Sequence, residues 1–254
     1  MMKETLIVEK RKLKALKNGV LLTGLPGIGL IGQVVGRYLV QELKAEKVAN
    51  IYSPHFPHQV FMTKKGGMRI IKNSIYVCRG KTRDIMILLG DVQAMSSVGQ
   101  YEVVGTILDY CQKYGVKEII TVGGYSTGKI AEVRRVFGVS TSETLREAFK
   151  KDGVIFGEAK GSIVGAAGLL PTLAKLRGID GSCLMGETHG SYIDTLSARQ
   201  IVVLLSKYLG FKVDLKRLDE QAEESQKVLK KVQEEVQKSM ESQFESSSKV
   251  SYIR

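Results

Sequence analysis

Short runs of Val, Ile and Leu alternate with longer stretches of helical periodicity along most of this chain, and this alternation is its most constraining feature. Short apolar runs suit strands that are covered on both faces, whereas apolar residues spaced three and four apart suit the helices that cover them. The pattern therefore predicts an α/β fold in which helices cover a mostly parallel sheet. A chain of 254 residues is long enough for one such domain or for two smaller ones.

The expected elements follow from these runs. Six strands are expected, over Val20–Thr23, Val48–Tyr52, Ser74–Cys78, Ile85–Leu89, Glu118–Val122 and Gly181–Met185. Five helices are expected, over Ile28–Leu43, Val98–Tyr114, Ser142–Lys151, Ala166–Arg177 and Leu196–Leu209. The Gly66-Gly67 pair separates Val60–Thr63 from Met68–Ile71, which predicts a β-hairpin inserted in the pattern. We assign residues 1–213 to an α/β core domain.

The composition changes after Gly210. From Asp214 to about Phe244 there is no Gly or Pro, and apolar residues recur at 3–4 spacing, so a long amphipathic helix is expected over residues 214–244. Residues 245–254 begin with Glu-Ser-Ser-Ser-Lys, which is typical of a flexible tail, and end in Val-Ser-Tyr-Ile-Arg. An apolar and aromatic end beyond a serine tether suggests a docking tip.

The net charge of +12 raises the question of a nucleic-acid partner. Residues 214–254 are nearly neutral, with eight Lys+Arg and nine Asp+Glu, so the positive charge belongs to the body of the chain. The densest cluster is Lys10, Arg11, Lys12, Lys14 and Lys17. No recognition helix, zinc finger or ribonucleoprotein motif accompanies it, so we interpret it as a solvated basic face and expect no nucleic acid.

Composition also bears on the compartment and on cofactors. No apolar run approaches the roughly 20 residues that a spanning helix needs, and charge appears too early for a signal peptide, so we expect a cytoplasmic protein without membrane contact. Cys78, Cys111 and Cys183 are too few and too far apart for a disulfide framework or a zinc site. We expect them to be small buried residues, and we expect no metal or cofactor.

Two glycine-rich segments invite an enzyme hypothesis. Gly27–Gly32 reads G-x-G-x-x-G after an expected strand, as in turns that bind a pyrophosphate. The acidic residue that would hold a ribose is missing from the end of the second strand, where Ser53-Pro54 follows. A tight turn packed on a neighbouring element explains the same glycines, and it leads us to expect that Gly27→Val destabilises the fold.

The second segment, Gly123–Lys129, fits G-x-x-x-x-G-K, and Ile85–Asp91 resembles an apolar strand that ends in a magnesium-binding acid. However, Ile130 stands where a phosphate loop needs a hydroxyl, and no clear helical pattern follows. A nucleotide-binding or nucleoside-processing enzyme that uses Gly27–Gly32 or Gly123–Lys129 stays open as the alternative function.

The three histidines offer little chemistry in the sequence. His55 and His58 flank Phe56-Pro57, but no nearby carboxylate or Cys completes a metal shell, and the proline prevents a helical display. His189 could join Glu187 in acid–base work, yet nothing local supplies a nucleophile. We interpret the histidines as hydrogen-bonded loop residues and expect no catalytic residue.

Four segments in register resemble the proteasome-assembly-chaperone family, in its archaeal Pba branch. They are Leu22–Gly32, Pro54–Pro57, Gly123–Tyr125 and Met185–Thr188 leading into the helix over residues 198–209, and the match covers about residues 6–210. The resemblance implies a three-layer fold related to purine nucleoside phosphorylases but used for protein binding. It also implies a homo-oligomer that engages proteasome α subunits, and for this tailed chain we expect a tetramer, with a pentamer as the alternative.

The family docks through a C-terminal hydrophobic-tyrosine-any-residue tripeptide whose terminal carboxylate pairs with a lysine. This chain ends Ser251-Tyr252-Ile253-Arg254, so its tyrosine stands third from the end rather than second. The resemblance assigns docking to Tyr252, Ile253 and the Arg254 carboxylate. We therefore expect a non-enzymatic assembly chaperone or regulator that uses the arm from Asp214 onward to capture α subunits.

Overall fold

The computed structural model describes residues 3–129, 131 and 133–223. The main strands are β1 (Leu6–Glu9), β2 (Gly19–Gly24), β3 (Glu46–Tyr52), β6 (Asn73–Cys78), β7 (Ile85–Gly90), β8 (Val116–Ser126), β9 (Val136–Ser140), β10 (Ile155–Phe156) and β11 (Asp180–Thr188). The helices are η1 (Ile28–Leu30), α1 (Ile31–Glu42), α2 (Ser97–Lys113), α3 (Glu143–Lys151), α4 (Ala166–Lys175) and α5 (Thr195–Leu209). The six strands and the five helices expected over residues 20–209 are confirmed, with ends shifted by a few residues.

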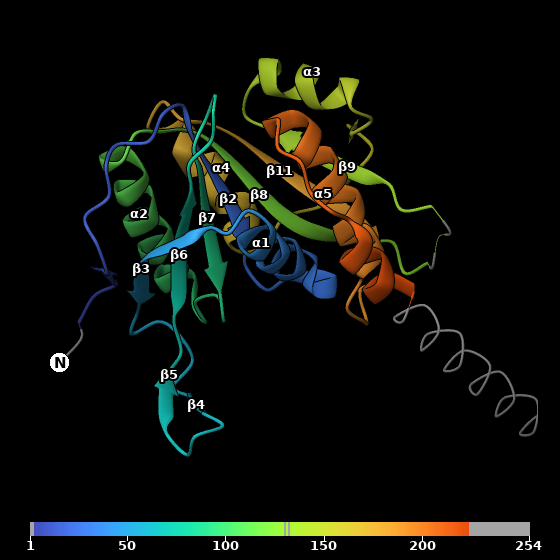
Figure 1. The fold of residues 1–254 in the computed structure, drawn as a ribbon. Helices are drawn as coiled ribbons and strands as arrows, with labels where there is room; N and C mark the ends of the chain where they lie inside the picture. Colours follow the sequence, from blue (N-terminus) through green and yellow to red (C-terminus); the bar gives the residue numbers. More distant parts are fainter. Residues whose placement is uncertain (1–2, 130, 132, 224–254) are drawn as a thin grey trace, which may run out of the picture. The chain divides into compact units, whose positions relative to one another are not determined.

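The chain up to Asp214 is one compact unit with a large sheet at its centre. Within the described residues the sheet has nine strands, in the order β1-β3-β6-β7-β2-β8-β11-β9-β10. Helices α1 and α5 cover one face, and α2 and α4 cover the other (Figure 1). Every residue of β2 is buried, and Leu21 packs in the same cluster as Val104 of α2 and Leu170 of α4. The expected α/β fold with three layers is confirmed.

The expectation of a mostly parallel sheet is wrong, because the sheet is mixed. Strands β7, β2, β8 and β11 are parallel neighbours, and so are β9 and β10. The pairs β1–β3, β3–β6, β6–β7 and β9–β11 are antiparallel. Parallel neighbours need a crossover of about a dozen residues or more, whereas β6 and β7 are joined by residues 79–84 alone. Apolar runs carry no information on strand direction, which the lengths of the connections decide.

The hairpin expected in residues 60–71 is confirmed as a separate two-stranded sheet. Strand β4 (Val60–Met62) pairs with β5 (Met68–Ile70), and Figure 1 shows the pair projecting beyond the large sheet. Its turn is closed by hydrogen bonds: the Thr63 amide donates to the Gly67 carbonyl (2.8 Å), and the Gly66 amide donates to the Thr63 carbonyl (2.9 Å). Gly66 has a φ of +76°, which glycine adopts without strain. The projecting hairpin is therefore an ordered feature.

The residues from Leu215 onward form a second unit. Residues 216–223 are helical, which agrees with the start of the helix expected over 214–244. The rest of that helix and the tail over 245–254 lie outside the described residues, so those assignments stay predictions. No helix of the described residues is long and apolar enough to cross a membrane. Cys111 and Cys183 are buried as expected, whereas Cys78 is only half-buried.

Glycines set how closely α1 approaches the sheet. A Cβ placed on Gly32 would lie 2.6 Å from the Val122 carbonyl oxygen of β8, and one placed on Gly36 would lie 2.6 Å from the Gly24 Cα of β2. Helix α1 therefore rests directly on the backbone of two strands. The expectation for Gly27 is wrong, because a Cβ there would meet no atom within 4 Å and its φ of −164° is ordinary extended backbone.

We predict that Gly32→Val destabilises the protein and that Gly27→Val does not. The β-branched side chain at Gly32 would overlap backbone atoms that cannot move independently, and such overpacking costs about 1–3 kcal/mol or more. Chemical unfolding followed by circular dichroism measures both variants. Equal unfolding midpoints for Gly32→Val and the wild type would contradict this account of the α1 contact.

Candidate functional site

The segment Gly123–Lys129 does not form a phosphate loop. Strand β8 continues through it to Ser126, and Gly124 is paired with Gly186 of β11. A Cβ at Gly124 would lie 2.4 Å from the Ile28 carbonyl oxygen, so this glycine serves close packing. The next element in the described residues is strand β9, whereas a phosphate loop leads into a helix. The geometry gives this segment a place in the sheet.

The turn at Gly27–Gly32 is fixed from outside by two hydrogen bonds. Gln93 Nε2 donates to the Pro26 carbonyl (2.7 Å), and the Asp194 amide donates to the Gly29 carbonyl (3.0 Å). Gly29 and Leu30 both have positive φ, +63° and +49°, which turns the chain from η1 into α1. Gly29, Gly32 and Gly124 therefore serve packing at the carboxyl ends of the parallel strands, where both segments also line a pocket of about 370 Å³.

Glu187 is engaged by an arginine rather than by His189. Its buried carboxylate accepts hydrogen bonds from Arg135 Nε (2.9 Å) and Nη2 (2.8 Å). These hydrogen bonds hold the pKa of Glu187 below its ordinary value. The His189 ring instead stacks on Tyr192, with 6.1 Å between the ring centroids. A carboxylate neutralised in this way is a poor proton acceptor, so the acid–base pair considered from the sequence is not assembled.

His55 belongs to a cluster that fastens the base of the hairpin. Its Nε2 lies 2.7 Å from Glu102 Oε2 on α2, and Glu102 Oε1 also accepts from the Thr5 amide (2.7 Å). Hydrogen bonds from Thr5 and His55 lower the pKa of Glu102. Ser53 Oγ accepts from Thr5 Oγ1 and from the His55 amide. The interpretation of His55 as a hydrogen-bonded loop residue is confirmed, while His58 is exposed.

The residues assigned to partner docking, Tyr252, Ile253 and Arg254, lie outside the described residues. Their role stays a prediction from the resemblance. Within residues 3–129, 131 and 133–223, no three His, Cys, Asp or Glu side chains come together in a group that could hold a metal ion.

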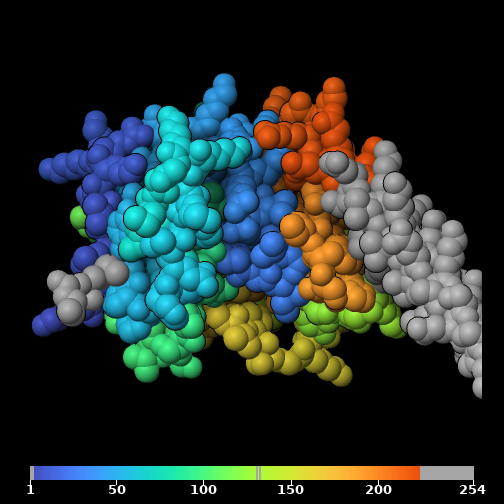
Figure 2. Space-filling view, turned by 90° about the horizontal axis from the view of Figure 1, so that it is seen from below, coloured from blue at the N-terminus to red at the C-terminus, as the bar shows by residue number. Residues whose placement is uncertain are grey.

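The hairpin exposes apolar side chains on both strands. Met62 and Met68 are 91% and 81% exposed, and Val60, Phe61 and Ile70 are also exposed. In Figure 2 the hairpin region stands in cyan on the surface that faces the viewer. The sequence predicts this hairpin from its Gly-Gly turn, but the exposure of its apolar residues depends on where the hairpin leaves the sheet. This surface was therefore not foreseen as functional.

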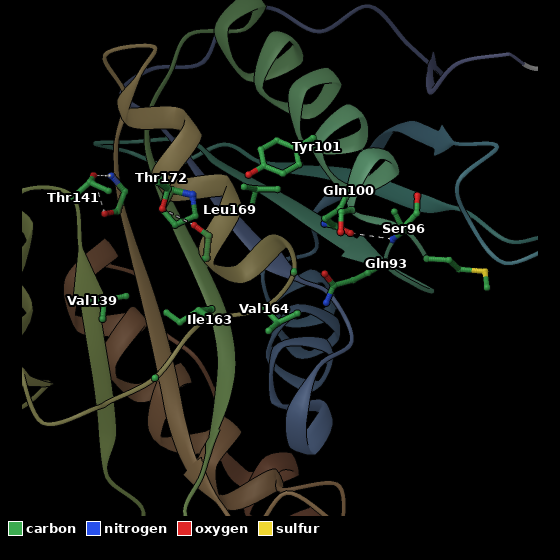
Figure 3. A pocket seen from close by; sticks show the side chains of 18 of the residues that line it. Gln93, Ser96, Gln100, Tyr101, Val139, Thr141, Ile163, Val164, Leu169 and Thr172 are labelled. Carbon is green, nitrogen blue, oxygen red and sulfur yellow. Dashed lines mark hydrogen bonds between the residues drawn. The ribbon is translucent and has the colours of Figure 1, made fainter.

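A groove of about 870 Å³ lies on the α2 and α4 side of the sheet. It is lined by the start of α2, residues 161–165, α4 and β9 (Figure 3). Apolar side chains include Tyr101, Val139, Ile163, Val164 and Leu169, and no charged side chain occurs among its described lining residues. The lining segments come from three separate parts of the sequence, at the start of α2, in β9 and in residues 161–175, so no local motif indicates the groove.

Comparison with known proteins settles the family. The model of the PAC2 family matches residues 21–233. The chain belongs to the PAC2 family. It is also similar to the uncharacterized protein MJ1210 of Methanocaldococcus jannaschii, with 34% identity over 213 residues, 84% of this chain and 82% of that protein.

Two solved structures of archaeal Pba proteins are similar to this PAC2 protein. PbaB of Pyrococcus furiosus, described as an archaeal proteasome activator, is 40% identical, with a TM-score of 0.86 over 91% of this chain and all of PbaB. PbaA of the same organism, described as an archaeal homolog of proteasome-assembly chaperone, is 24% identical, with a TM-score of 0.76 over 98% of this chain and all of PbaA. The second likeness concerns the fold. Together with the family match, these structures confirm the resemblance to the Pba branch.

We predict that Glu187→Gln lowers the melting temperature at pH 7 by about 2–4 °C, because the charge-assisted pair with Arg135 is lost. Since the pKa of Glu187 is lowered by folding, its contribution is present above its ordinary pKa of about 4.3 and is lost as the pH falls through the lowered value. The difference in melting temperature between Glu187→Gln and the wild type should therefore become smaller below about pH 4.

The matched control is Glu143→Gln, which removes an exposed carboxylate paired with Arg146 on the surface of α3. Surface ion pairs of this kind contribute little to the free energy of unfolding, so this variant should have the same melting temperature as the wild type. Differential scanning calorimetry from pH 3 to pH 8 makes the comparison. A difference for Glu187→Gln that persists unchanged to pH 3 would contradict the assignment of an ionised, arginine-bound carboxylate.

Proposed function

We propose that this PAC2 protein is a non-enzymatic proteasome assembly chaperone or activator that binds proteasome α subunits in the cytoplasm. The observation that carries the proposal is the likeness to PbaB, described as an archaeal proteasome activator, at 40% identity and a TM-score of 0.86. The course of the two glycine-rich segments supports a binding protein over the nucleotide-dependent alternative, because Gly123–Ser126 runs within strand β8 and because Gly32 and Gly124 pack closely on neighbouring backbone.

The proposed protein works as a homo-oligomer, a tetramer or alternatively a pentamer, that presents several capture arms at once. Each arm begins at Asp214, where the compact unit ends. Linked tails that bind weakly one by one gain affinity together, because the first contact raises the local concentration of the others. A flexible tether also lets the symmetry of the oligomer differ from the symmetry of the target.

Docking in this proposal is performed by Tyr252, Ile253 and the carboxylate of Arg254. An aromatic ring and an aliphatic side chain supply apolar area to a pocket, and a terminal carboxylate supplies a charge that a lysine on the α subunit neutralises. In this chain the tyrosine is one position farther from the carboxylate than in the family's tripeptide. Ile253 accordingly occupies the position that tyrosine holds in that tripeptide.

We predict that Tyr252→Ala weakens binding to purified proteasome α subunits by tenfold or more, because truncation of an aromatic anchor at an interface typically costs about 2 kcal/mol. The matched control is Ser247→Ala in the tether, which should bind as the wild type does. Biolayer interferometry with immobilised α subunits gives the dissociation constants.

The oligomer mass of Tyr252→Ala, measured by light scattering, should equal that of the wild type, because the tip is separated from the core by the tether. Equal affinity of Tyr252→Ala and the wild type for α subunits would contradict the assignment of the tip. A wild-type chain that does not bind α subunits at all would contradict the proposed function itself.

A further inference from the structure

We propose that a basic pocket beside α1 binds the phosphate group of a small phosphorylated ligand. The pocket has a volume of about 230 Å³, and its described lining includes four cations, Arg37, Lys47, Arg69 and Lys72, and one carboxylate, Asp91. It shares no described lining residue with the groove beside α4 or with the pocket at the strand ends. This ligand site is separate from the proposed docking tip, so the inference does not depend on proteasome binding.

The register of three strands brings the floor of the pocket to one face of the sheet. Tyr76 of β6 pairs with Lys47 of β3, and Ser74 of β6 pairs with Leu89 of β7. Residues that are directly opposite in a ladder point to the same face, and so do residues two apart in one strand. Arg37 reaches the same pocket from α1, which packs on β7. The fold thus gathers cations that are far apart in the sequence.

The positive charge of this pocket is not balanced by the described carboxylates. Asp91 is already engaged, because its carboxylate accepts from the guanidinium of Arg69 and from the amide of Lys72 (3.2 Å). In the part of the chain that the structure describes, no Asp or Glu forms an ion pair with Arg37, Lys47 or Lys72. Three of the four cations therefore line the pocket without a counter-charge among the described residues.

Lys72 shows what this imbalance does to the protein. Its side chain is half-buried, and burial lowers the pKa of its ammonium, which the nearby positive charge of Lys47 lowers further. Cations held together without a counter-ion raise the free energy of the folded state, and a bound anion removes that repulsion. Residues that oppose folding are typical of binding sites, where function offsets their cost in stability. A pocket with this character is therefore expected to have an anionic ligand.

The size and lining of the pocket select a phosphate group among anions. A phosphate monoester carries a charge of about −1.5 to −2 at pH 7 and has three acceptor oxygens, whereas a carboxylate supplies a single charge. Arg and Lys both recognise phosphate, through a fork of donors and through a point charge. The described lining offers Leu89 and Tyr76 as its only large apolar or aromatic side chains, too few for the core of a protein interface. A nucleic-acid strand needs an extended basic groove rather than one small pocket.

A full-length double variant, Lys47→Gln with Lys72→Gln, tests the proposal. It removes two charges of the pocket but keeps the pair of Arg69 with Asp91 and the hydrogen bond from the backbone amide of residue 72. Isothermal titration calorimetry with pyrophosphate in about 0.15 M salt should show one site per chain in the wild type and an affinity at least tenfold lower in the double variant. Equal affinities of the two proteins would overturn the proposal.

The matched control is Lys64→Gln with Lys65→Gln, which lowers the net charge by the same amount as the double variant does. Both lysines are exposed at the turn of the β4–β5 hairpin, and neither lines the pocket. This control should bind pyrophosphate as the wild type does. An equal loss of affinity in both variants would indicate attraction by net charge alone and would overturn the site.

Melting temperatures separate a ligand site from a structural role of the two lysines. Without ligand, the double variant should melt at the wild-type temperature or above it, because repulsion between cations is removed. Pyrophosphate should raise the melting temperature of the wild type and of the control and leave that of the double variant nearly unchanged, since a ligand stabilises only a state that binds it. A double variant that melts well below the wild type without ligand would contradict the unbalanced charge on which the proposal rests.

Further probes identify the source of the phosphate group. Tighter binding of adenosine diphosphate than of pyrophosphate would support a nucleotide ligand, and equal binding would support recognition of the phosphate groups alone. A wild-type chain that binds neither probe would overturn the proposal and leave proteasome binding to its own test. If neither probe binds and the double variant loses affinity for α subunits or for duplex DNA, the pocket belongs to an acidic macromolecular partner, and the phosphate site is again overturned.

Discussion

The direct contact between α1 and the backbones of β2 and β8 is the constraint on which the rest of this structure depends. Gly32 and Gly36 of the helix and Gly24 of β2 leave no room for a Cβ at the contact, so the helix sits closer to the sheet than side chains would permit. This approach fixes the turn at Gly27–Gly32 and brings Ile28 over Gly124. At the carboxyl ends of the parallel strands, where many α/β proteins bind ligands, this packing leaves a pocket of about 370 Å³ beside Gly27 and Gly123.

Besides this pocket at the strand ends, the described residues carry further exposed apolar surface. It is concentrated on the hairpin that leaves the sheet between β3 and β6, and along the groove beside α4. Two carboxylates of the core are engaged by fixed partners: Glu187 of β11 pairs with Arg135, and Glu102 of α2 is hydrogen-bonded to Thr5 and His55. A rigid core with apolar outer features suits a protein that binds other proteins, including copies of itself.

The sequence predicts the central elements well because their signal is local. Val20–Thr23 is apolar without interruption, so it is covered on both faces, and Gly66-Gly67 marks a turn between two apolar runs. Strands β1 and β9 were not predicted, since β1 lies at an edge of the sheet with half of its residues exposed and β9 is interrupted by Gly138. The direction of the strands was predicted wrongly, because direction depends on connections and not on apolar runs.

The candidate surfaces were less predictable, because they depend on how segments distant in sequence are placed and not on a local pattern. The G-x-G-x-x-G spacing identifies a crowded turn but not which glycine is crowded, since that depends on Val122, a residue about 90 positions along the chain. The groove needs α2, α4 and β9 to be placed before it exists. The family, in contrast, was recognisable from short segments in register, because these segments form the turns and strand ends that define the core.

The measurement that tests the central claim most directly is native mass spectrometry of the unmodified chain mixed with purified proteasome α subunits, beside a chain that ends at Glu245. The account predicts a complex of an oligomer of this protein with α subunits, and no complex for the chain without its tip. A wild-type chain that forms no complex would contradict the account, and a complex of equal abundance for both chains would contradict the role of the tip.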